Sequence, residues 1–336
     1  MSTITKPPRL KAGDTVGIAS PAASWVPTLE GFFQRGVAYL QQLGLHVRMA
    51  DHTRCQREHL NISAHQRADD LNTLFADSTI KAIICLSGGS GTNALLPLLD
   101  WATVERCPKI VMGYSAVTAL LVGLYARTSL VTLHGPMILD GFSEFPELLP
   151  YTRQQLERVL FKAEPVGVLN PPVEWTTDCP YEDRPRQMQP NPGWRWLRPG
   201  TAHGRLIGGN LHALLTLAGT PYWPFFQGAI LCLEEVKMGN TVLRWIDESL
   251  AHLTMLGLFE DISGLVVGKI NDLSEEEERL FEHLILEYTA SYNFPILTQV
   301  DFGHTDPRLV LLIGVLASLD SDHDLFCIEE AAVTEG

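Results

Sequence analysis

The sequence is short of positive charge. Its 336 residues include 25 lysines and arginines against 39 aspartates and glutamates, a formal net charge of −14. Nucleic-acid backbones and anionic membrane surfaces both favour basic patches, so we expect neither a nucleic-acid polymer nor a membrane as the main partner. No apolar run approaches the roughly 20 residues that span a bilayer, and residues 1–20 lack the apolar core of a secretory signal. We therefore expect a cytoplasmic protein.

Closely spaced cysteines are also missing. None of the six cysteines forms the C-x-x-C arrangement that zinc and redox sites use. Several lie in apolar runs such as "AIICL" and "AILCL", where a thiol packs as a small hydrophobic group. The pattern indicates reduced, structural thiols, at Cys55, Cys85, Cys107, Cys179, Cys232 and Cys327.

The first part of the chain alternates strand-like and helix-like segments. Short apolar runs such as "TVGIAS", "IKAIICLS" and "KIVMGY" are separated by amphipathic stretches such as "LEGFFQRGVAYLQQLG". This alternation predicts right-handed βαβ crossovers and a parallel sheet with helices on both faces. We expect a doubly wound α/β domain over residues 1–142.

The rest of the chain divides into a connector and a second domain. Residues 143–203 contain one helical pattern and then a stretch rich in proline and tryptophan with little periodicity, which is typical of a functional loop or a linker. Residues 204–336 combine short strand patterns with a few helices, which predicts a β-rich, barrel-like α/β domain. We expect the active site between the two domains.

Ser115 follows the apolar run "KIVMGY" and precedes a helical pattern. A serine here can be the N-cap of the helix, because its oxygen accepts a hydrogen bond from a free helix N–H. A serine on a sharp strand-to-helix turn is also how a nucleophile is presented to a substrate. The stretch by itself allows both interpretations.

Other strand-like runs end in residues that could work with a serine nucleophile. The glycines of "LSGGSGTN" allow backbone N–H groups to face an oxyanion, although a simple turn before a helix would look the same. His304 follows the strand "PILTQVDF" and is the best candidate for a base, which Glu234 at the end of "AILCL" could orient. Glu234 could instead emerge into solvent. If the strand continues to Glu235, this neighbour should point to the opposite face, so that only one of the two glutamates faces the site.

At these residues the sequence resembles the LD-carboxypeptidase family of serine peptidases, and within it the branch of microcin C immunity peptidases. The matching segments occur in order over nearly the whole chain: "GDTVGIASPAA", "LSGGSGTNALLPLLD", "MGYSAVTALL", "LHGPM", "GWRWLRPGTAHGRLIGGNL", "AGTPYWP", "ILCLEEV", "GLVVGK" and "VDFGHTDP". The resemblance implies a Rossmann-like N-terminal domain beside a β-rich C-terminal domain, usually in a homodimer, with no metal or cofactor.

The resemblance also implies roles for individual residues. Ser115 would be the nucleophile, His304 the general base and then acid, and Glu234 the residue that fixes the imidazole. The oxyanion hole would come from the backbone N–H of Ala116 and of the turn at Gly88 and Gly89. The family usually has aspartate at position 116 and tends to have proline at position 312, where this chain has alanine and leucine.

The branch determines the expected substrate. The carboxypeptidase branch typically has R-G-G-Y-G where this chain has "SGGSG", so that Ser87 and Ser90 replace the arginine and the tyrosine. The immunity branch hydrolyses an amide between an acidic amino acid and a nucleotide-like group, and aromatic residues of the connector can stack on the base. Trp194 and Trp196 are the candidates, with structural anchoring as the alternative.

We accordingly expect a serine hydrolase that acts on a small molecule or peptide with a free carboxylate. A muropeptide LD-carboxypeptidase of cell-wall recycling and a non-catalytic binding protein are the alternatives. Three further residues are candidates for substrate contacts, each with a plain structural alternative as a helix cap or a surface lysine: Asn210, Lys237 and Lys269.

Overall fold

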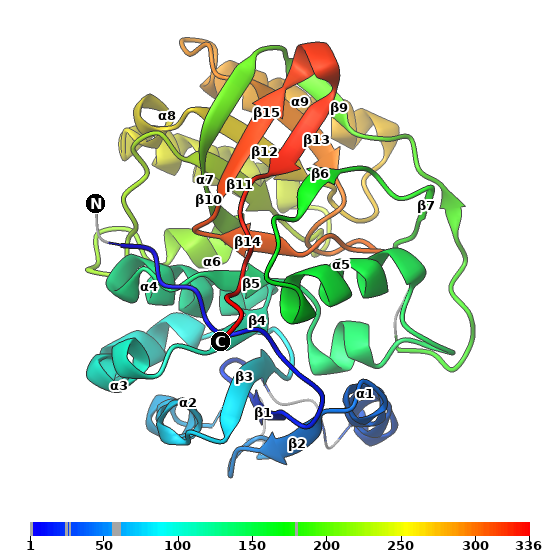
Figure 1. The fold of residues 1–336 in the computed structure, drawn as a ribbon. Coiled ribbons are helices and arrows are strands. Elements are labelled where there is room, and N and C mark those ends of the chain that lie inside the picture. The colour runs from blue at the N-terminus through cyan, green and yellow to red at the C-terminus, as the bar shows by residue number, and fades with distance from the viewer. Residues whose placement is uncertain (1–2, 24–25, 27, 56–61, 179–180) are drawn as a thin grey trace.

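The computed structural model describes residues 3–23, 26, 28–55, 62–178 and 181–336. Two sheets organise these residues, and in Figure 1 they lie one above the other, with helices at the level between them. Of the six cysteines, Cys179 lies outside the described residues, and the other five are free thiols. Among the described residues no helix is both long and apolar enough to cross a membrane.

The first sheet has six strands in the order β14-β5-β4-β3-β1-β2. Strands β1 to β5 are parallel, and of these β1, β3, β4 and β5 are largely buried, as in sheets covered on both faces, whereas β2 is a mostly exposed edge strand. The predicted doubly wound arrangement is confirmed, and β14 adds to the sheet antiparallel to β5. The strands are β1 (Thr15–Ala19), β2 (His46–Met49), β3 (Ile80–Cys85), β4 (Ile110–Gly113), β5 (Thr132–His134) and β14 (Leu311–Ile313).

The helices of the N-terminal part connect these strands. Ser63 begins α2 with a capping box, in which its hydroxyl accepts from the Gln66 N–H and the Gln66 side chain accepts in return. The 3₁₀ segment η1 covers Thr92–Leu98, and η2 covers Ser115–Val117. The α-helices are α1 (Glu30–Gln42), α2 (Ala64–Ala76), α3 (Trp101–Arg106), α4 (Thr118–Thr128) and α5 (Pro150–Phe161).

The second sheet has eight strands in the order β6-β16-β15-β10-β11-β12-β13-β9. Strands β10 to β13 are parallel to one another, and the outer strands are antiparallel. A β-rich α/β C-terminal part was predicted and is confirmed. The strands are β6 (Gly167–Leu169), β9 (Arg195–Arg198), β10 (Thr201–Asn210), β11 (Ile230–Glu234), β12 (Gly264–Gly268), β13 (Ile296–Val300), β15 (Leu316–Asp320) and β16 (Leu325–Ile328).

Four helices accompany the second sheet, and the acidic run 275–278 begins the last of them. Ser274 caps this helix in a second capping box with Glu277, and the negative charge of the run complements the helix dipole. The connector adds a small ribbon of β7 (Glu174–Trp175) and β8 (Gln189–Pro190). The four helices are α6 (Leu211–Leu215), α7 (Val242–Met255), α8 (Leu258–Asp261) and α9 (Glu275–Tyr288).

The two sheets share their hydrophobic core. One buried cluster contains Leu120 and Leu121 of α4 together with Leu211 and Leu214 of α6, and α4 also contacts β10 directly. Because apolar surface is buried across this boundary, the carboxyl ends of β4 and β11 are held in a fixed relation. This relation positions the candidate site.

Candidate active site

Ser115 lies on a strained turn between β4 and α4. Its φ is +59°, a left-handed conformation that a non-glycine residue rarely adopts and that is typical of functional sites. Neither η2 nor α4 has a side-chain hydrogen bond at its N-cap, so Ser115 does not cap the helix. The geometry is that of a nucleophile elbow, which holds a hydroxyl at the carboxyl edge of a parallel sheet.

The glycine turn after β3 packs directly against this serine. A Cβ on Gly88 would lie 3.1 Å from the Ser115 Cβ and 3.2 Å from its Oγ. The backbone at Gly89 has a φ of +135°, and a Cβ there would lie 2.7 Å from the Ala23 Cβ. A side chain at Gly88 would crowd Ser115 and one at Gly89 would clash with Ala23, so the two glycines let the chain pass close to the Ser115 hydroxyl.

Glu234 and His304 form a buried pair at the carboxyl end of the second sheet. The His304 Nδ1 lies 2.6 Å from the Glu234 Oε2, and the Glu234 side chain is fully buried. Gly303 permits this contact, since a Cβ at its φ of +99° would lie 2.5 Å from the same oxygen. With Nδ1 bonded to the carboxylate, His304 keeps Nε2 for the cleft, which it lines together with Ser115.

A second imidazole approaches the same carboxylate. The His134 Nε2, at the end of β5, lies 3.6 Å from the Glu234 Oε1, and neither of these buried atoms has a hydrogen-bond partner among the described residues. Sequence reasoning did not single out His134, since "LVTLHG" reads only as a strand followed by a turn. The position of His134 beside Glu234 follows only from the way the folded chain packs the end of β5 near the end of β11.

These contacts shift the pKa values of the pair in opposite directions. Burial would raise the pKa of Glu234, but the positive charge and hydrogen bond of His304, together with the nearby His134 imidazole, outweigh burial and lower this pKa to about 2. Burial would lower the pKa of His304, yet the Glu234 charge and hydrogen bond outweigh it and raise the pKa above 6.5. Glu234 is therefore ionised at neutral pH and able to stabilise an imidazolium.

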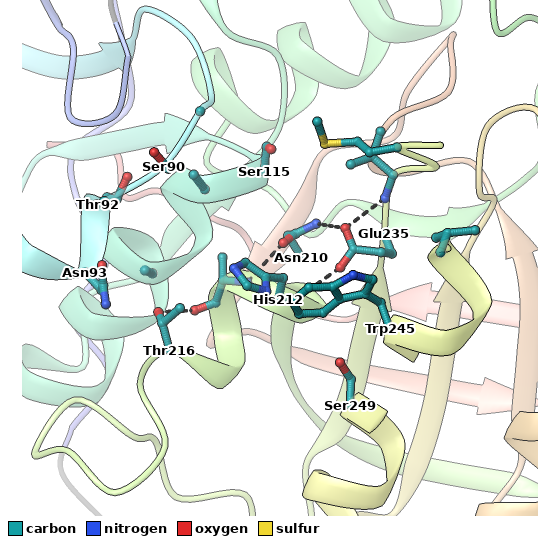
Figure 2. Close-up of a pocket in the computed structure, with 18 residues that line it drawn as sticks. Ser90, Thr92, Asn93, Ser115, Asn210, His212, Thr216, Glu235, Trp245 and Ser249 are labelled. Carbon is teal, nitrogen blue, oxygen red and sulfur yellow. Dashed lines mark hydrogen bonds between the residues drawn. The ribbon is translucent and has the colours of Figure 1, made fainter. Parts of the chain in front are cut away.

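Two pockets flank Ser115. The first, which we call the Glu235 pocket, has a volume of about 360 Å³, and Figure 2 shows it with Ser115, Asn210 and Glu235 around it. The second, the Arg308 pocket, has a volume of about 310 Å³. The Glu235 pocket is lined by residues that include Gly89, Ser90, Ser115, Ala116, Asn210, His212, Glu235 and Trp245, and the Arg308 pocket by residues that include Ser87, Gly88, Tyr114, Ser115, Arg186, His304, Asp306 and Arg308.

The Arg308 pocket contains a buried ionic network beside the imidazole. The Arg308 guanidinium donates to Asp306 at 3.0 Å and lies over the Tyr114 ring, 4.3 Å from its centroid. The Tyr114 ring in turn meets the His304 ring edge-on at 4.9 Å. Arg186, from the connector, donates to the same Asp306 at 2.8 Å. The network ties the connector to the loop that carries His304.

Asn210 caps α6, as its structural alternative predicts, and also lines the Glu235 pocket. Its Oδ1 accepts from the Ala213 N–H at 3.0 Å, and its Nδ2 donates to the Glu235 Oε1 at 2.9 Å. The expectation that only one of the two glutamates faces the site is wrong. Strand β11 ends at Glu234, so the alternation of faces stops there, and Glu235 lines the pocket beside Ser115.

The two candidate lysines have partners within the protein. Lys237 donates to Glu277 at 2.8 Å, and buried Lys269 donates to Asp301 and, at 3.0 Å, to Asn191. Neither lysine is among the residues that line the two pockets in the described part of the chain.

The two candidate tryptophans are anchored in a similar way. The Trp194 indole donates to Asp301 at 2.8 Å, and the Trp196 indole donates to Asp324 at 2.8 Å. Among the described residues that line the pockets, neither tryptophan occurs. The aromatic residues that do line them are Trp245, in the Glu235 pocket, and Tyr114 and Tyr181, in the Arg308 pocket.

Comparison with known proteins gives consistent matches over the whole chain. The family models of the LD-carboxypeptidase N-terminal and C-terminal domains match residues 16–135 and 203–319. A putative carboxypeptidase of Vibrio cholerae is 32% identical over 96% of both chains. The microcin C7 self-immunity protein MccF of Escherichia coli is 29% identical over 96% of this chain and 94% of its own. A probable murein peptide carboxypeptidase of Bacillus subtilis is 29% identical over 98% of this chain and 96% of its own.

Solved structures of MccF have the same fold. MccF in complex with glutamyl sulfamoyl guanosine superposes with a TM-score of 0.90, at 29% identity and over 98% of this chain and 99% of that chain. MccF in complex with aspartyl sulfamoyl adenosine gives a TM-score of 0.91, with 98% of this chain and all of that chain covered. The likeness therefore extends over both sheets and the connector.

Proposed function

This chain belongs to the LD-carboxypeptidase family of serine peptidases, and from that premise we propose that it hydrolyses an amide bond between an acidic amino acid and a nucleotide-like group. Ser115, His304 and Glu234 are the proposed catalytic triad. One observation carries the proposal: the strained Ser115 elbow and the Glu234–His304 pair meet in one cleft.

In the first step the Ser115 Oγ attacks the substrate carbonyl carbon while His304 Nε2 takes the hydroxyl proton. The negative charge that develops on the carbonyl oxygen is stabilised by the N–H of Ala116 and by the Gly88–Gly89 turn, which passes close to the serine. The carbon–nitrogen bond then breaks, and His304 returns the proton to the leaving nitrogen. An ester between Ser115 and the acyl group remains.

In the second step a water molecule attacks this ester. His304 takes a proton from the water and returns it to the Ser115 oxygen as the ester bond breaks, so that the acid is released and the enzyme is restored. Glu234 stays ionised throughout and holds the imidazole by its Nδ1–H.

The Arg308 pocket supports a leaving group larger than an amino acid. In the carboxypeptidase branch of the family an arginine would stand at position 87, whereas the Ser87 hydroxyl here bonds within the protein to the Ala23 carbonyl at 2.6 Å. The smaller side chain leaves pocket volume to the substrate. MccF itself is described in complex with aspartyl sulfamoyl adenosine, the kind of molecule that we propose for this site.

Hydrolysis of two substrates by the wild type and by Ser115→Ala tests this function. We expect cleavage of glutamyl sulfamoyl adenosine, a fall of at least about 10³-fold in the variant, and little cleavage of an L,D-tetrapeptide. Cleavage of the tetrapeptide alone would instead support the murein activity for which the Bacillus subtilis relative is named. Absence of cleavage of both would favour a binding protein.

A further inference from the structure

Glu235 places a carboxylate on the wall of the pocket beside Ser115. Its Oε1 accepts from the Asn210 amide at 2.9 Å and from the Val236 N–H at 2.9 Å, and its Oε2 accepts from the His212 N–H at 3.2 Å. These three bonds fix the side chain in one orientation, as Figure 2 shows. Oε1 already accepts two of these bonds and Oε2 only one, so Oε2 retains capacity for a further donor.

In the described part of the chain, no lysine or arginine balances this carboxylate. Every one of those donors is neutral, and no lysine or arginine among the described residues forms an ion pair with Glu235. Burial raises the pKa of Glu235, and the Glu234 carboxylate beside it raises the pKa further. A half-buried carboxylate in such surroundings is stabilised when a ligand brings a positive charge to it.

The position of His304 indicates which part of the substrate occupies this pocket. The general acid has to reach the leaving nitrogen, and His304 lines the Arg308 pocket but is not among the residues that line the Glu235 pocket in the described part of the chain. The leaving group therefore belongs on the Arg308 side of Ser115. The acyl group belongs in the Glu235 pocket.

The far wall of the Glu235 pocket is aromatic. Trp245, at the start of α7, is 54% exposed and meets the His212 ring edge-on, with 5.6 Å between ring centroids. Figure 2 shows the two rings side by side below Asn210 and Glu235. An indole face tolerates an ammonium group close to it, so the wall is compatible with a cationic acyl group.

We infer that Glu235 binds the free amino group of the substrate's acyl part, so that the site selects substrates with an unblocked, protonated amine next to the scissile carbonyl. The inference rests on the proposed function and adds a requirement to it. Asn210 is then a positioning residue, because its amide holds Glu235 toward the pocket while its own oxygen caps α6.

A pair of substrates that differ by one amine tests the inference. Glutamyl sulfamoyl adenosine carries the amine, and glutaryl sulfamoyl adenosine has hydrogen in its place, so no added bulk confuses the comparison. We expect the glutamyl-to-glutaryl ratio of kcat/KM to fall about 10-fold to 100-fold from wild type to Glu235→Gln, the scale of a hydrogen bond to a charged group. Any difference in intrinsic reactivity between the two compounds cancels when this ratio is compared between the wild type and the variant. Glu248→Gln, an exposed carboxylate on α7, is the matched control and should leave the ratio unchanged.

Binding to Ser115→Ala separates this inference from the proposed function. Calorimetry should give tighter binding of the glutamyl than of the glutaryl compound, and the preference should disappear in Ser115→Ala with Glu235→Gln. Cleavage of both compounds with a ratio that Glu235→Gln does not change would overturn the inference and leave the function intact. Should Glu235→Gln fail to fold, equal binding of both compounds to Ser115→Ala would overturn it equally.

Discussion

At the scale of single residues, the buried Glu234 carboxylate determines how His304 titrates. The His304 Nδ1 lies 2.6 Å from one carboxylate oxygen and the His134 Nε2 lies 3.6 Å from the other. These two imidazoles take the place of the water that burial removes. A carboxylate in such a position stays charged and holds the His304 ring in one tautomer. Ser115 has no part in this pair; its strained φ brings it to the same cleft from the other sheet.

The pH dependence of kcat/KM follows from the His304 pKa. His304 must be neutral to act as a base, so kcat/KM is expected to fall as the pH drops through its pKa. That pKa lies above 6.5, because the effect of Glu234 outweighs that of burial. Stopped assays between about pH 5 and pH 8 measure the profile, and a flat profile over that range would contradict the role of His304.

Glu234→Gln provides the matched comparison for this profile. The amide carries no charge, so the midpoint should move to lower pH, and kcat should fall by about 10³-fold to 10⁴-fold because the imidazole loses its preferred tautomer. The control is Glu329→Gln, because Glu329 pairs with His203 on the surface of the protein. This variant should change neither the midpoint nor kcat.

At the scale of elements, the close approach of β10 to α4 joins the two halves of the site. The Asn210 N–H donates to the Thr118 hydroxyl at 3.0 Å, directly behind the Ser115 elbow. Gly209 makes this approach possible. Its φ is +137°, and a Cβ there would lie 2.7 Å from the Thr118 Oγ1 and 2.8 Å from the His134 Cδ2.

Gly209→Ala is therefore expected to lower the free energy of unfolding by about 1–3 kcal/mol, the usual cost of overpacking, and to reduce kcat. Urea denaturation measures the first effect. Gly31→Ala on α1 is the control, since a Cβ there has open space around it, and it should leave stability unchanged or raise it by up to about 1 kcal/mol. Equal stability of the two variants would contradict the close contact.

The elements differ in how far the sequence predicts them. Local sequence patterns predict β1, β3 and β4, which are apolar runs, and α1, which is amphipathic. Strand β14 is three residues long and pairs with β5 across about 180 positions of sequence, so nothing local indicates its partner. For the same reason the strand pattern places Glu235 on the wrong face, because the end of β11 depends on its tertiary surroundings.

At the scale of the whole molecule, the site lies where the two sheets meet across a shared core. Ser115 follows β4 of the first sheet, while Glu234 ends β11 of the second sheet and His304 follows its strand β13. Arg186 of the connector donates to Glu144, at the start of the connector, and to Asp306, and so holds the connector against the second part. The ordered motifs, through their resemblance to the family, predict that Ser115, Glu234 and His304 meet. Only the packing shows that Trp194 and Trp196 bond to aspartates of the second part and that Glu235 lines a pocket. The homodimer stays a prediction.

Labelling with a serine-directed phosphonate tests the central claim, that Ser115 is a nucleophile activated by the Glu234–His304 pair, most directly. Intact-mass spectrometry of the wild type should show a single adduct, which peptide mapping should place on Ser115. The adduct should be absent from Ser115→Ala and should form much more slowly in His304→Gln. An adduct that persists in Ser115→Ala, or a wild type that is never labelled, would contradict the account.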